Sequence, residues 1–187
     1  MKLDEIMEKR RAYRSLEKIE ISEKIIREIA EEVRLAPSCF NYQPWNFIFV
    51  TDKEMLDRIT SEMMSKSNDW TKRASTIVAV FSKKKDDCVV KNREYFLFDT
   101  GMATAYLILK ATDMGLVAHP IAGYDEDKTK EILNIPEEYT LITLLIIGKH
   151  SEEINELLTD KQAEIEKNRP ERKKIDEFIY QNKYESD

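Results

Sequence analysis

Apolar and polar positions follow two different periods along this chain, and the change of period marks the expected elements. Apolar residues recur at helical spacing in five stretches, which predicts helices over residues 3–11, 22–33, 55–64, 91–114 and 125–135. Short apolar runs rich in β-branched residues predict strands over residues 46–51, 75–82 and 140–149, and residues 116–124 are expected to form a strand followed by a loop. The charged tail is expected to be helical. No repeat or Gly/Ser linker interrupts this order, so the pattern predicts one α+β domain over residues 1–187, with three or four strands in its sheet.

The expected helix over residues 91–114 is apolar on nearly every side, which predicts a central position in the fold. Gly115 follows this helix, and a glycine at the C′ position ends many helices. Ser22 precedes the second expected helix and has the side chain of a good N-cap. These two residues therefore predict helix ends that the apolar spacing does not define.

The composition favours a globular protein with one core. Of the 187 residues, 42% are hydrophobic, and the formal net charge is −6, with lysines and arginines interspersed among acids. No broad basic face is expected, so nucleic acid is not an expected partner. The N-terminus carries acids where a signal peptide needs an apolar run, and no apolar run approaches the ~18 residues that span a bilayer. We therefore expect a cytoplasmic protein with no membrane partner.

Residue types that support self-sufficient side-chain chemistry are scarce. The four glycines are too widely spaced for a dinucleotide-binding fingerprint, a P-loop or a nucleophile elbow. His119 and His150 form no metal-ligand pattern, and Cys39 and Cys88 form no C-x-x-C pair. We therefore expect no metal site and two free thiols. Such a chain either binds a partner or takes its chemistry from a cofactor.

Three stretches have the composition of a ligand site. In "KRRAYR" (residues 9–14), a continued helix would bring three arginines to one spot, where an anion would relieve their repulsion; a solvated face balanced by Glu8 and Glu17 is the alternative. The loop "APSCFNYQPW" (residues 36–45) interleaves three large rings with hydrogen-bonding side chains, or else its rings cap the core. In "AHPIAGY" (residues 118–124), a glycine after a buried strand lets backbone N–H groups approach a flat ligand, although an ordinary turn is the alternative.

In this order and at this spacing, the three stretches resemble the FMN-dependent nitroreductase family. "KRRAYRSL" is similar to the family's N-terminal R-R-S-x-R phosphate motif, and "APSCFNYQPWNFIFV" is similar to its A-P-S-x-x-N-x-Q-P-W loop and strand. Residues 114–149 resemble its later segment, in which a long helix leads to a strand, a flavin-contacting loop and the last core strand. Ala12 departs from the motif, because many members have serine there, and Ala122 replaces an acid that some subgroups carry.

The resemblance implies a three-layer α-β-α sandwich with a mixed, mostly antiparallel sheet. It implies a domain-swapped homodimer with one FMN in each of two interface clefts. It also implies ping-pong hydride transfer from NADH or NADPH, through flavin N5, to a nitroaromatic, quinone or flavin acceptor, with no catalytic side chain. The alternatives are a flavin-binding protein without turnover, a flavin-dependent reductive dehalogenase or desaturase, and a cofactor-free interaction domain.

Residue by residue, the resemblance assigns FMN contacts to three groups. Arginines would hold the phosphate and the pyrimidine side of the ring, a loop from the partner subunit would close the cleft, and backbone after the later strand would face N5. The arginines are Arg10, Arg11, Arg14 and Arg172. The loop from the partner subunit contributes Pro37, Ser38, Cys39 and Asn41. The backbone that faces N5 belongs to Pro120, Ile121, Ala122 and Gly123. Arg169 is the alternative to Arg172, and Asn68 is a further candidate for the pyrimidine edge. Gln43 is expected to brace the loop, and His119 to be a packed, hydrogen-bonded residue.

Overall fold

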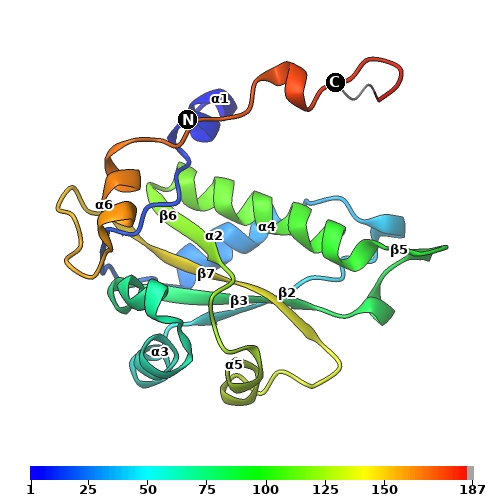
Figure 1. Ribbon diagram of the computed structural model, residues 1–187. Helices are drawn as coiled ribbons and strands as arrows, with labels where there is room; N and C mark the ends of the chain where they lie inside the picture. Colours follow the sequence, from blue (N-terminus) through cyan, green and yellow to red (C-terminus); the bar gives the residue numbers. More distant parts are fainter. Residues whose placement is uncertain (185–187) are drawn as a thin grey trace.

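The computed structural model describes residues 1–184, in which an antiparallel sheet lies between two layers of helices (Figure 1). The strands are β1 (Leu16–Glu17), β2 (Asn46–Val50), β3 (Thr76–Ser82), β6 (Leu116–Ile121) and β7 (Thr140–His150). β7 pairs with β3 along one edge and with β6 along the other, and the short β1 pairs with the end of β7. β7 is antiparallel to β1, β3 and β6, and β2 is antiparallel to β3. The parallel pairing expected in a mixed sheet is therefore not found within residues 1–184.

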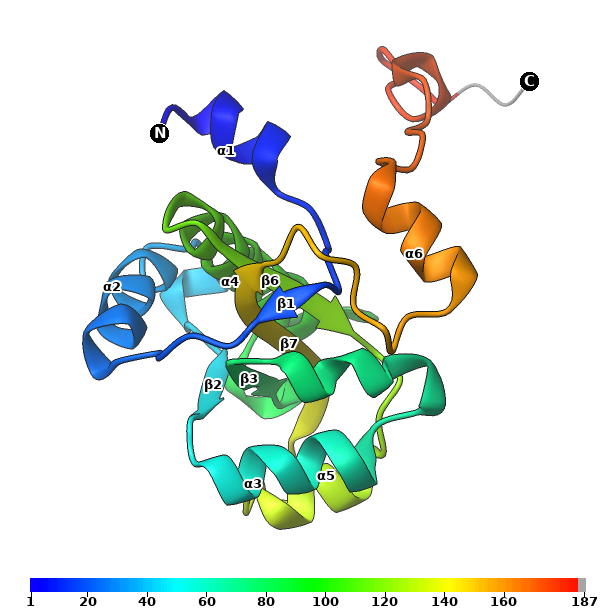
Figure 2. The ribbon, with the colours of Figure 1, turned by 90° about the vertical axis from the view of Figure 1, so that its left-hand side faces the viewer.

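The central strands are buried on both faces because each face packs against its own helices. The layers are formed by α3 (Lys53–Arg58) and α5 (Glu126–Ile132) on one face and by α2 (Glu23–Val33) and α4 (Tyr95–Asp113) on the other (Figures 1 and 2). Ile77 and Ile146 belong to the core on the side of α3 and α5, whereas Val78 and Leu145 belong to the core on the side of α2 and α4. Successive side chains of a strand point to opposite faces, so a doubly covered strand needs a continuous apolar run. The expected three-layer arrangement is confirmed for this chain.

The long helix α4 begins later than expected. Residues 89–94 form a hairpin that turns at Lys91, where φ is +57°, so the helix starts at Tyr95. It ends as expected, because Gly115 adopts a left-handed φ of +77°. The remaining elements are α1 (Leu3–Lys9), α6 (Asp160–Lys167), β4 (Val89–Val90), β5 (Arg93–Glu94), η1 (Cys39–Asn41), η2 (Ile59–Met63), η3 (Lys66–Arg73), η4 (Lys84–Asp86) and η5 (Ile175–Glu177).

Helix α1 and the chain after α6 project from the same side of the body (Figures 1 and 2). Both segments expose large apolar side chains, as does the outer face of α4; these residues include Leu3, Met7, Leu97, Phe98, Ile175, Phe178 and Ile179. Large exposed apolar patches usually mark interaction surfaces. None of the described helices combines the length and apolar character needed to cross a bilayer.

Candidate functional site

Arginines from the two ends of the chain line one cavity of about 270 Å³. We call it the arginine groove, and its lining residues are Arg10, Arg11, Ala12, Arg14, Ile165, Arg169, Pro170 and Arg172. Helix α1 ends at Lys9, and Arg10 already has an extended ψ of 114°. The expectation that a continued helix brings the arginines together is therefore wrong, because an extended segment does so. The predicted cluster itself is present, and the structure places Arg169 and Arg172 in it together.

The groove concentrates positive charge. Burial and the neighbouring guanidinium groups of Arg172, Arg169 and Arg11 lower the pKa of Arg10. Burial also lowers the pKa of Arg14, although the Glu166 carboxylate opposes this effect. A group of like charges is stabilised by an anion, and the planar guanidinium suits phosphate oxygens. The groove therefore has the electrostatic character of a phosphate site.

The arginines of the groove have different contacts. Arg11 donates to the carbonyl oxygens of Ile165, at 2.8 Å, and Glu166, at 3.2 Å, so it fastens α6 to the N-terminal segment. Arg169 donates to carbonyl oxygens of the N-terminal segment in the same way. Within residues 1–184, the side chains of Arg10, Arg14 and Arg172 form no such hydrogen bond. These three guanidinium groups are therefore the ones available to a ligand.

A buried glutamate positions the segment that carries the arginines. Glu166, in α6, is 8% exposed, and its carboxylate accepts hydrogen bonds from the backbone N–H groups of Arg14, at 2.7 Å, and Ser15, at 3.1 Å. Charge-assisted hydrogen bonds of this kind are about twice as strong as neutral ones. A helix in the charged tail was expected, but this glutamate was not singled out from the sequence, because the contact spans 152 residues and leaves no local pattern.

The predicted stretch "AHPIAGY" (residues 118–124) begins in β6, and Asn68 holds the loop in which it ends. The carbonyl oxygen of Gly123 accepts from the Ser65 N–H and from Asn68 Nδ2, both at 3.0 Å. Asn68 Oδ1 in turn accepts from the indole N–H of Trp70 at 3.3 Å, and the Arg14 guanidinium lies 5.9 Å from the centre of the Trp70 ring. The structure therefore links this loop to the arginine groove through Asn68 and Trp70. Trp70 was missed from the sequence, since a lone tryptophan in a polar stretch gives no functional signal.

Small side chains and free backbone N–H groups face outward where β6 ends. Ile121 is 8% exposed and belongs to the core, whereas Pro120 and Ala122 are exposed. Within the described residues, the backbone N–H groups of Ala122 and Gly123 donate to no protein acceptor. Two adjacent free donors at the end of a buried strand suit a hydrogen-bond acceptor on a flat ligand.

His119 is packed and hydrogen-bonded, as expected from the sequence. It is 6% exposed, its Nδ1 lies 3.0 Å from the carbonyl oxygen of Tyr13, and its ring lies 4.8 Å from that of Trp70. Burial lowers the pKa of His119 to about 4. The imidazole is therefore neutral at neutral pH.

Replacing Gly123 by alanine is expected to destabilise the protein by about 1–2 kcal/mol, the cost of one or two disturbed hydrogen bonds. A Cβ at this position would lie 2.7 Å from Ser65 Oγ and 2.8 Å from Asn68 Nδ2, so both side chains must move. Urea unfolding measures the loss. In an Asn68→Ala background the added cost should shrink, because one of the two obstructing side chains is gone; an unchanged cost would contradict this account.

The predicted stretch "APSCFNYQPW" (residues 36–45), which we call the aromatic loop, has a strained backbone. Phe40, Asn41 and Gln43 all have positive φ, between 47° and 59°. The loop is braced from within, because Gln43 N–H donates to Ser38 Oγ at 2.9 Å and Gln43 Nε2 donates to the Asn41 carbonyl oxygen at 3.2 Å. The expected bracing role of Gln43 is confirmed. Strain that the surrounding contacts maintain is common in ligand-binding loops.

The expectation of two free thiols is wrong. Cys39 and Cys88 form a disulfide that joins the aromatic loop to the segment before β4, although 49 residues separate them. The hairpin of β4 and β5 and the start of α4 bring the two cysteines together, and neither contact follows from local spacing.

The aromatic loop and the arginine groove lie at opposite ends of α4. Asp99, near the start of α4, accepts the Cys39 N–H at 2.6 Å, whereas Asp113, at its end, pairs with the N-terminus of the chain. A helix of 19 residues is about 28 Å long. One chain therefore brings Arg10, Arg14 and Arg172 near the loop after β6, but it does not bring Pro37, Ser38, Cys39 and Asn41 to them.

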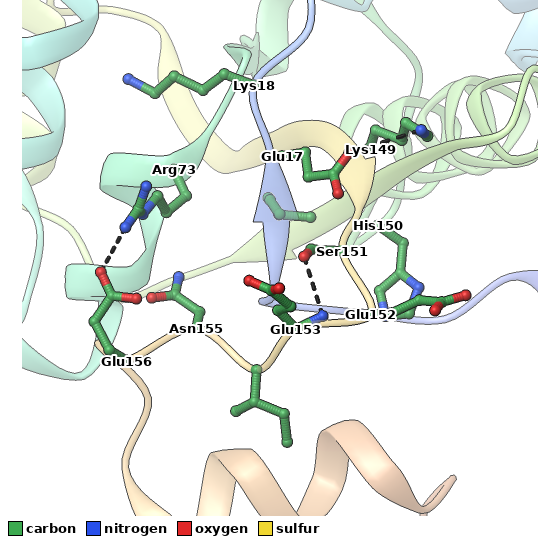
Figure 3. A pocket seen from close by; sticks show the side chains of 12 residues that line it. Glu17, Lys18, Arg73, Lys149, His150, Ser151, Glu152, Glu153, Asn155 and Glu156 are labelled. Atoms are coloured by element: carbon green, nitrogen blue, oxygen red, sulfur yellow. Dashed lines mark hydrogen bonds and ion pairs between the residues drawn. The ribbon is translucent and has the colours of Figure 1, made fainter.

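A larger cavity of about 870 Å³ lies beside the site, at the end of β7, and contains none of the predicted ligand residues (Figure 3). Glu17, Lys149 and the residues 150–156 line it, with charges of both signs and an ion pair of 2.5 Å between Arg73 and Glu156. Mixed charge that is already paired provides less for an anion than the uniformly positive groove. The arginine groove is therefore the better candidate site.

The chain has an α+β fold, and its arginine groove has the charge that suits an anion. Against known families, residues 7–67 and 57–149 match the nitroreductase family, and the chain belongs to this family. It is 28% identical over 186 residues to YdgI of Bacillus subtilis (strain 168), which carries the name of an NAD(P)H nitroreductase; the match covers 80% of this chain and 88% of YdgI.

Two solved structures have the same fold. One, described as an oxidoreductase containing FMN, has a TM-score of 0.85 at 23% identity; the match covers 100% of this chain and 95% of that one. The other is a nitroreductase-type protein from Exiguobacterium sibiricum 255-15 in complex with FMN, with a TM-score of 0.80 at 23% identity; the match covers 97% of this chain and 98% of that one.

Proposed function

We propose that this protein is an FMN-dependent oxidoreductase that takes hydride from NADH or NADPH and delivers it to a nitroaromatic, quinone or flavin acceptor. The observation that carries the proposal is the arginine groove, where the side chains of Arg10, Arg14 and Arg172 donate to no acceptor in the described residues 1–184. Family membership and relatives named for FMN and NAD(P)H support the same reading. The ping-pong order of the two half-reactions is part of the proposal.

The chain's own residues fit this cofactor. Arg10 and Arg172 would hold its phosphate, Arg14 would place positive charge at the pyrimidine side, and the free N–H groups of Ala122 and Gly123 would face the flavin edge. FMN, when bound, supplies the hydride chemistry. The protein orients this group through the Asn68 hydrogen bond to Gly123 and excludes water with the buried Trp70. No side-chain acid or base is required, and the neutral His119 is not assigned a proton transfer.

We also propose that the active form is a homodimer. Phe40, Leu97 and Phe98 are exposed at 85%, 48% and 63%, around the end of α4 that carries the aromatic loop. A partner chain would cover these side chains and would bring its own aromatic loop to the arginine groove, so that Pro37, Ser38, Cys39 and Asn41 complete the site in trans. The dimer mass in solution and about one FMN per chain test this arrangement. The cytoplasmic location expected from the sequence stays a prediction.

The proposed activity is tested by anaerobic reduction of the FMN-loaded protein with NADH and with NADPH, followed by a nitroaromatic, a quinone and free FMN as acceptors. The proposal requires loss of the oxidised flavin absorbance on adding the nicotinamide and its return on adding an acceptor. Flavin that binds but is not reduced would favour a carrier or sensor. A protein that stays colourless after saturation with FMN would favour a cofactor-free role.

Replacing Arg10 by alanine is expected to weaken FMN binding by about 1.5–3 kcal/mol, the scale of a charge-assisted hydrogen bond. Riboflavin, which lacks the phosphate, should bind equally well to both proteins. Equilibrium dialysis of each ligand gives the two affinities. Arg73→Ala is the matched control, because it removes the same charge outside the groove and should change FMN binding little. Equal losses for FMN and riboflavin would assign Arg10 a structural role.

A further inference from the structure

A second cluster of reactive side chains lies away from the arginine groove. Cys39, Asp87 and Cys88 place two sulfur atoms and a carboxylate oxygen within 4.8 Å of one another. In the oxidised protein the sulfurs form the disulfide that ties the aromatic loop to the segment before β4. Two thiols and a carboxylate at this separation are also a set of metal ligands, so the reduced state of the cluster has its own possible chemistry.

Each cysteine is held in place by an aspartate through its own backbone. Asp99 Oδ2 accepts the Cys39 N–H at 2.6 Å, and Asp87 Oδ1 accepts the Cys88 N–H at 2.7 Å. Neither hydrogen bond involves a sulfur atom, so reduction of the disulfide breaks neither of them. The Cα atoms are 6.0 Å apart. The two thiols will therefore stay adjacent after reduction.

One carboxylate oxygen of the cluster has no partner. Asp87 Oδ2 is buried, and no hydrogen-bond donor in residues 1–184 reaches it. The charged group that faces Asp87 is the carboxylate of Asp99, which adds negative charge, while Lys83 pairs with Asp86 and Lys84 pairs with Glu94. A buried carboxylate oxygen without a partner is costly, and a bound cation would remove that cost. The orphaned oxygen is an observation independent of the cysteines.

We propose that the reduced protein binds one zinc ion through the thiolates of Cys39 and Cys88 and Oδ2 of Asp87. Zinc forms bonds of about 2.3 Å to thiolate and about 2.0–2.2 Å to carboxylate in a tetrahedral arrangement. The three ligand atoms already lie within 4.8 Å of one another, and the two sulfurs must move apart after reduction to bind one ion. Soft thiolates select zinc over magnesium or calcium. Three protein ligands leave the fourth position to water.

The site forms only after reduction of the disulfide. A dithiol reductant supplies two electrons and two protons, becomes a cyclic disulfide itself, and leaves two thiols on the protein. Zinc binding then releases a proton from each thiol that has not already lost one, because the ligands are thiolates. A reducing compartment would favour this state. The aromatic loop is then tied to the segment before β4 by the metal instead of by the disulfide. This proposal does not depend on FMN binding.

The experiment uses the full chain in two forms: one left oxidised, and one reduced with a dithiol and freed of reductant under anaerobic conditions. Each form is titrated with Co²⁺ as the probe, and zinc is then added to displace it. We expect the reduced protein to bind one Co²⁺ per chain, with thiolate-to-cobalt charge-transfer absorbance, and the oxidised protein to show none. Circular dichroism follows the fold of both forms.

Two single-residue variants test whether the negative charge of Asp87 is needed for metal binding. Asp87→Asn keeps an oxygen that accepts the Cys88 N–H but loses the anionic ligand, so Co²⁺ affinity of the reduced form should fall at least tenfold. Asp86→Asn, next to it on the surface, is the matched control and should bind as the wild type does. The proposal is overturned if the reduced chain shows no thiolate–cobalt band, if it loses its fold on reduction, or if Asp87→Asn binds Co²⁺ as tightly as Asp86→Asn.

Discussion

Trp70→Ala is expected to lower the free energy of unfolding by about 3–5 kcal/mol, the usual loss for a large aromatic residue removed from a core. The Trp70 side chain extends from η3, is 0% exposed and packs in the core against residues of the sheet, with its ring 4.8 Å from that of His119. Removing it leaves a cavity and also leaves Asn68 Oδ1 without its donor. The change therefore combines a packing loss with an unmade hydrogen bond.

Urea unfolding followed by far-ultraviolet circular dichroism measures this loss without relying on tryptophan fluorescence. Trp70→Phe separates the two contributions, because it keeps a ring in the core but removes the indole N–H; we expect it to cost about 1–2 kcal/mol. A loss below 1 kcal/mol for Trp70→Ala would show that this side chain is not central to the packing around the site.

The burial of His119 is expected to make the protein less stable in mild acid by about 3 kcal/mol in total. The folded pKa is lowered to about 4, whereas an unfolded histidine titrates near 6.5. Between these values the unfolded chain binds a proton that the folded chain does not bind. Stability from this residue is therefore complete above about pH 6.5, falls as the pH decreases towards 4, and changes no further below that.

His119→Gln isolates this effect, because glutamine keeps a donor for the Tyr13 carbonyl oxygen and does not titrate. The quantity to measure is the difference in unfolding free energy between wild type and variant at several pH values from 4 to 7. Carboxylates and His150 titrate in both proteins, so their contributions cancel in the difference. We expect the wild-type advantage to shrink as the pH falls; a constant difference would show that His119 titrates equally in the folded and unfolded states.

The order and type of most elements follow from the sequence by itself, because these depend on side chains a few positions apart. The continuous apolar runs of β3 and β7 predict strands that are covered on both faces. Ser22 caps the start of α2 and Gly115 follows the end of α4, both as expected. The arginine cluster was also visible, since Arg10, Arg11 and Arg14 are neighbours in the chain. The spacing nevertheless predicted the wrong backbone conformation for this cluster, because the helix ends at Lys9 and the arginines lie on an extended segment.

Tertiary structure decided the features that depend on residues far apart in the chain. It brought Arg169 and Arg172 to Arg10, placed Glu166 under the backbone of Arg14, and linked Gly123 to Trp70 through Asn68. It also joined Cys39 to Cys88 across 49 residues. These pairings arise because the sheet and its two helix layers must pack together, which fixes distances that no period in the sequence encodes. The separation of the aromatic loop from the arginine groove has the same cause, because the rigid helix α4 holds them at its two ends.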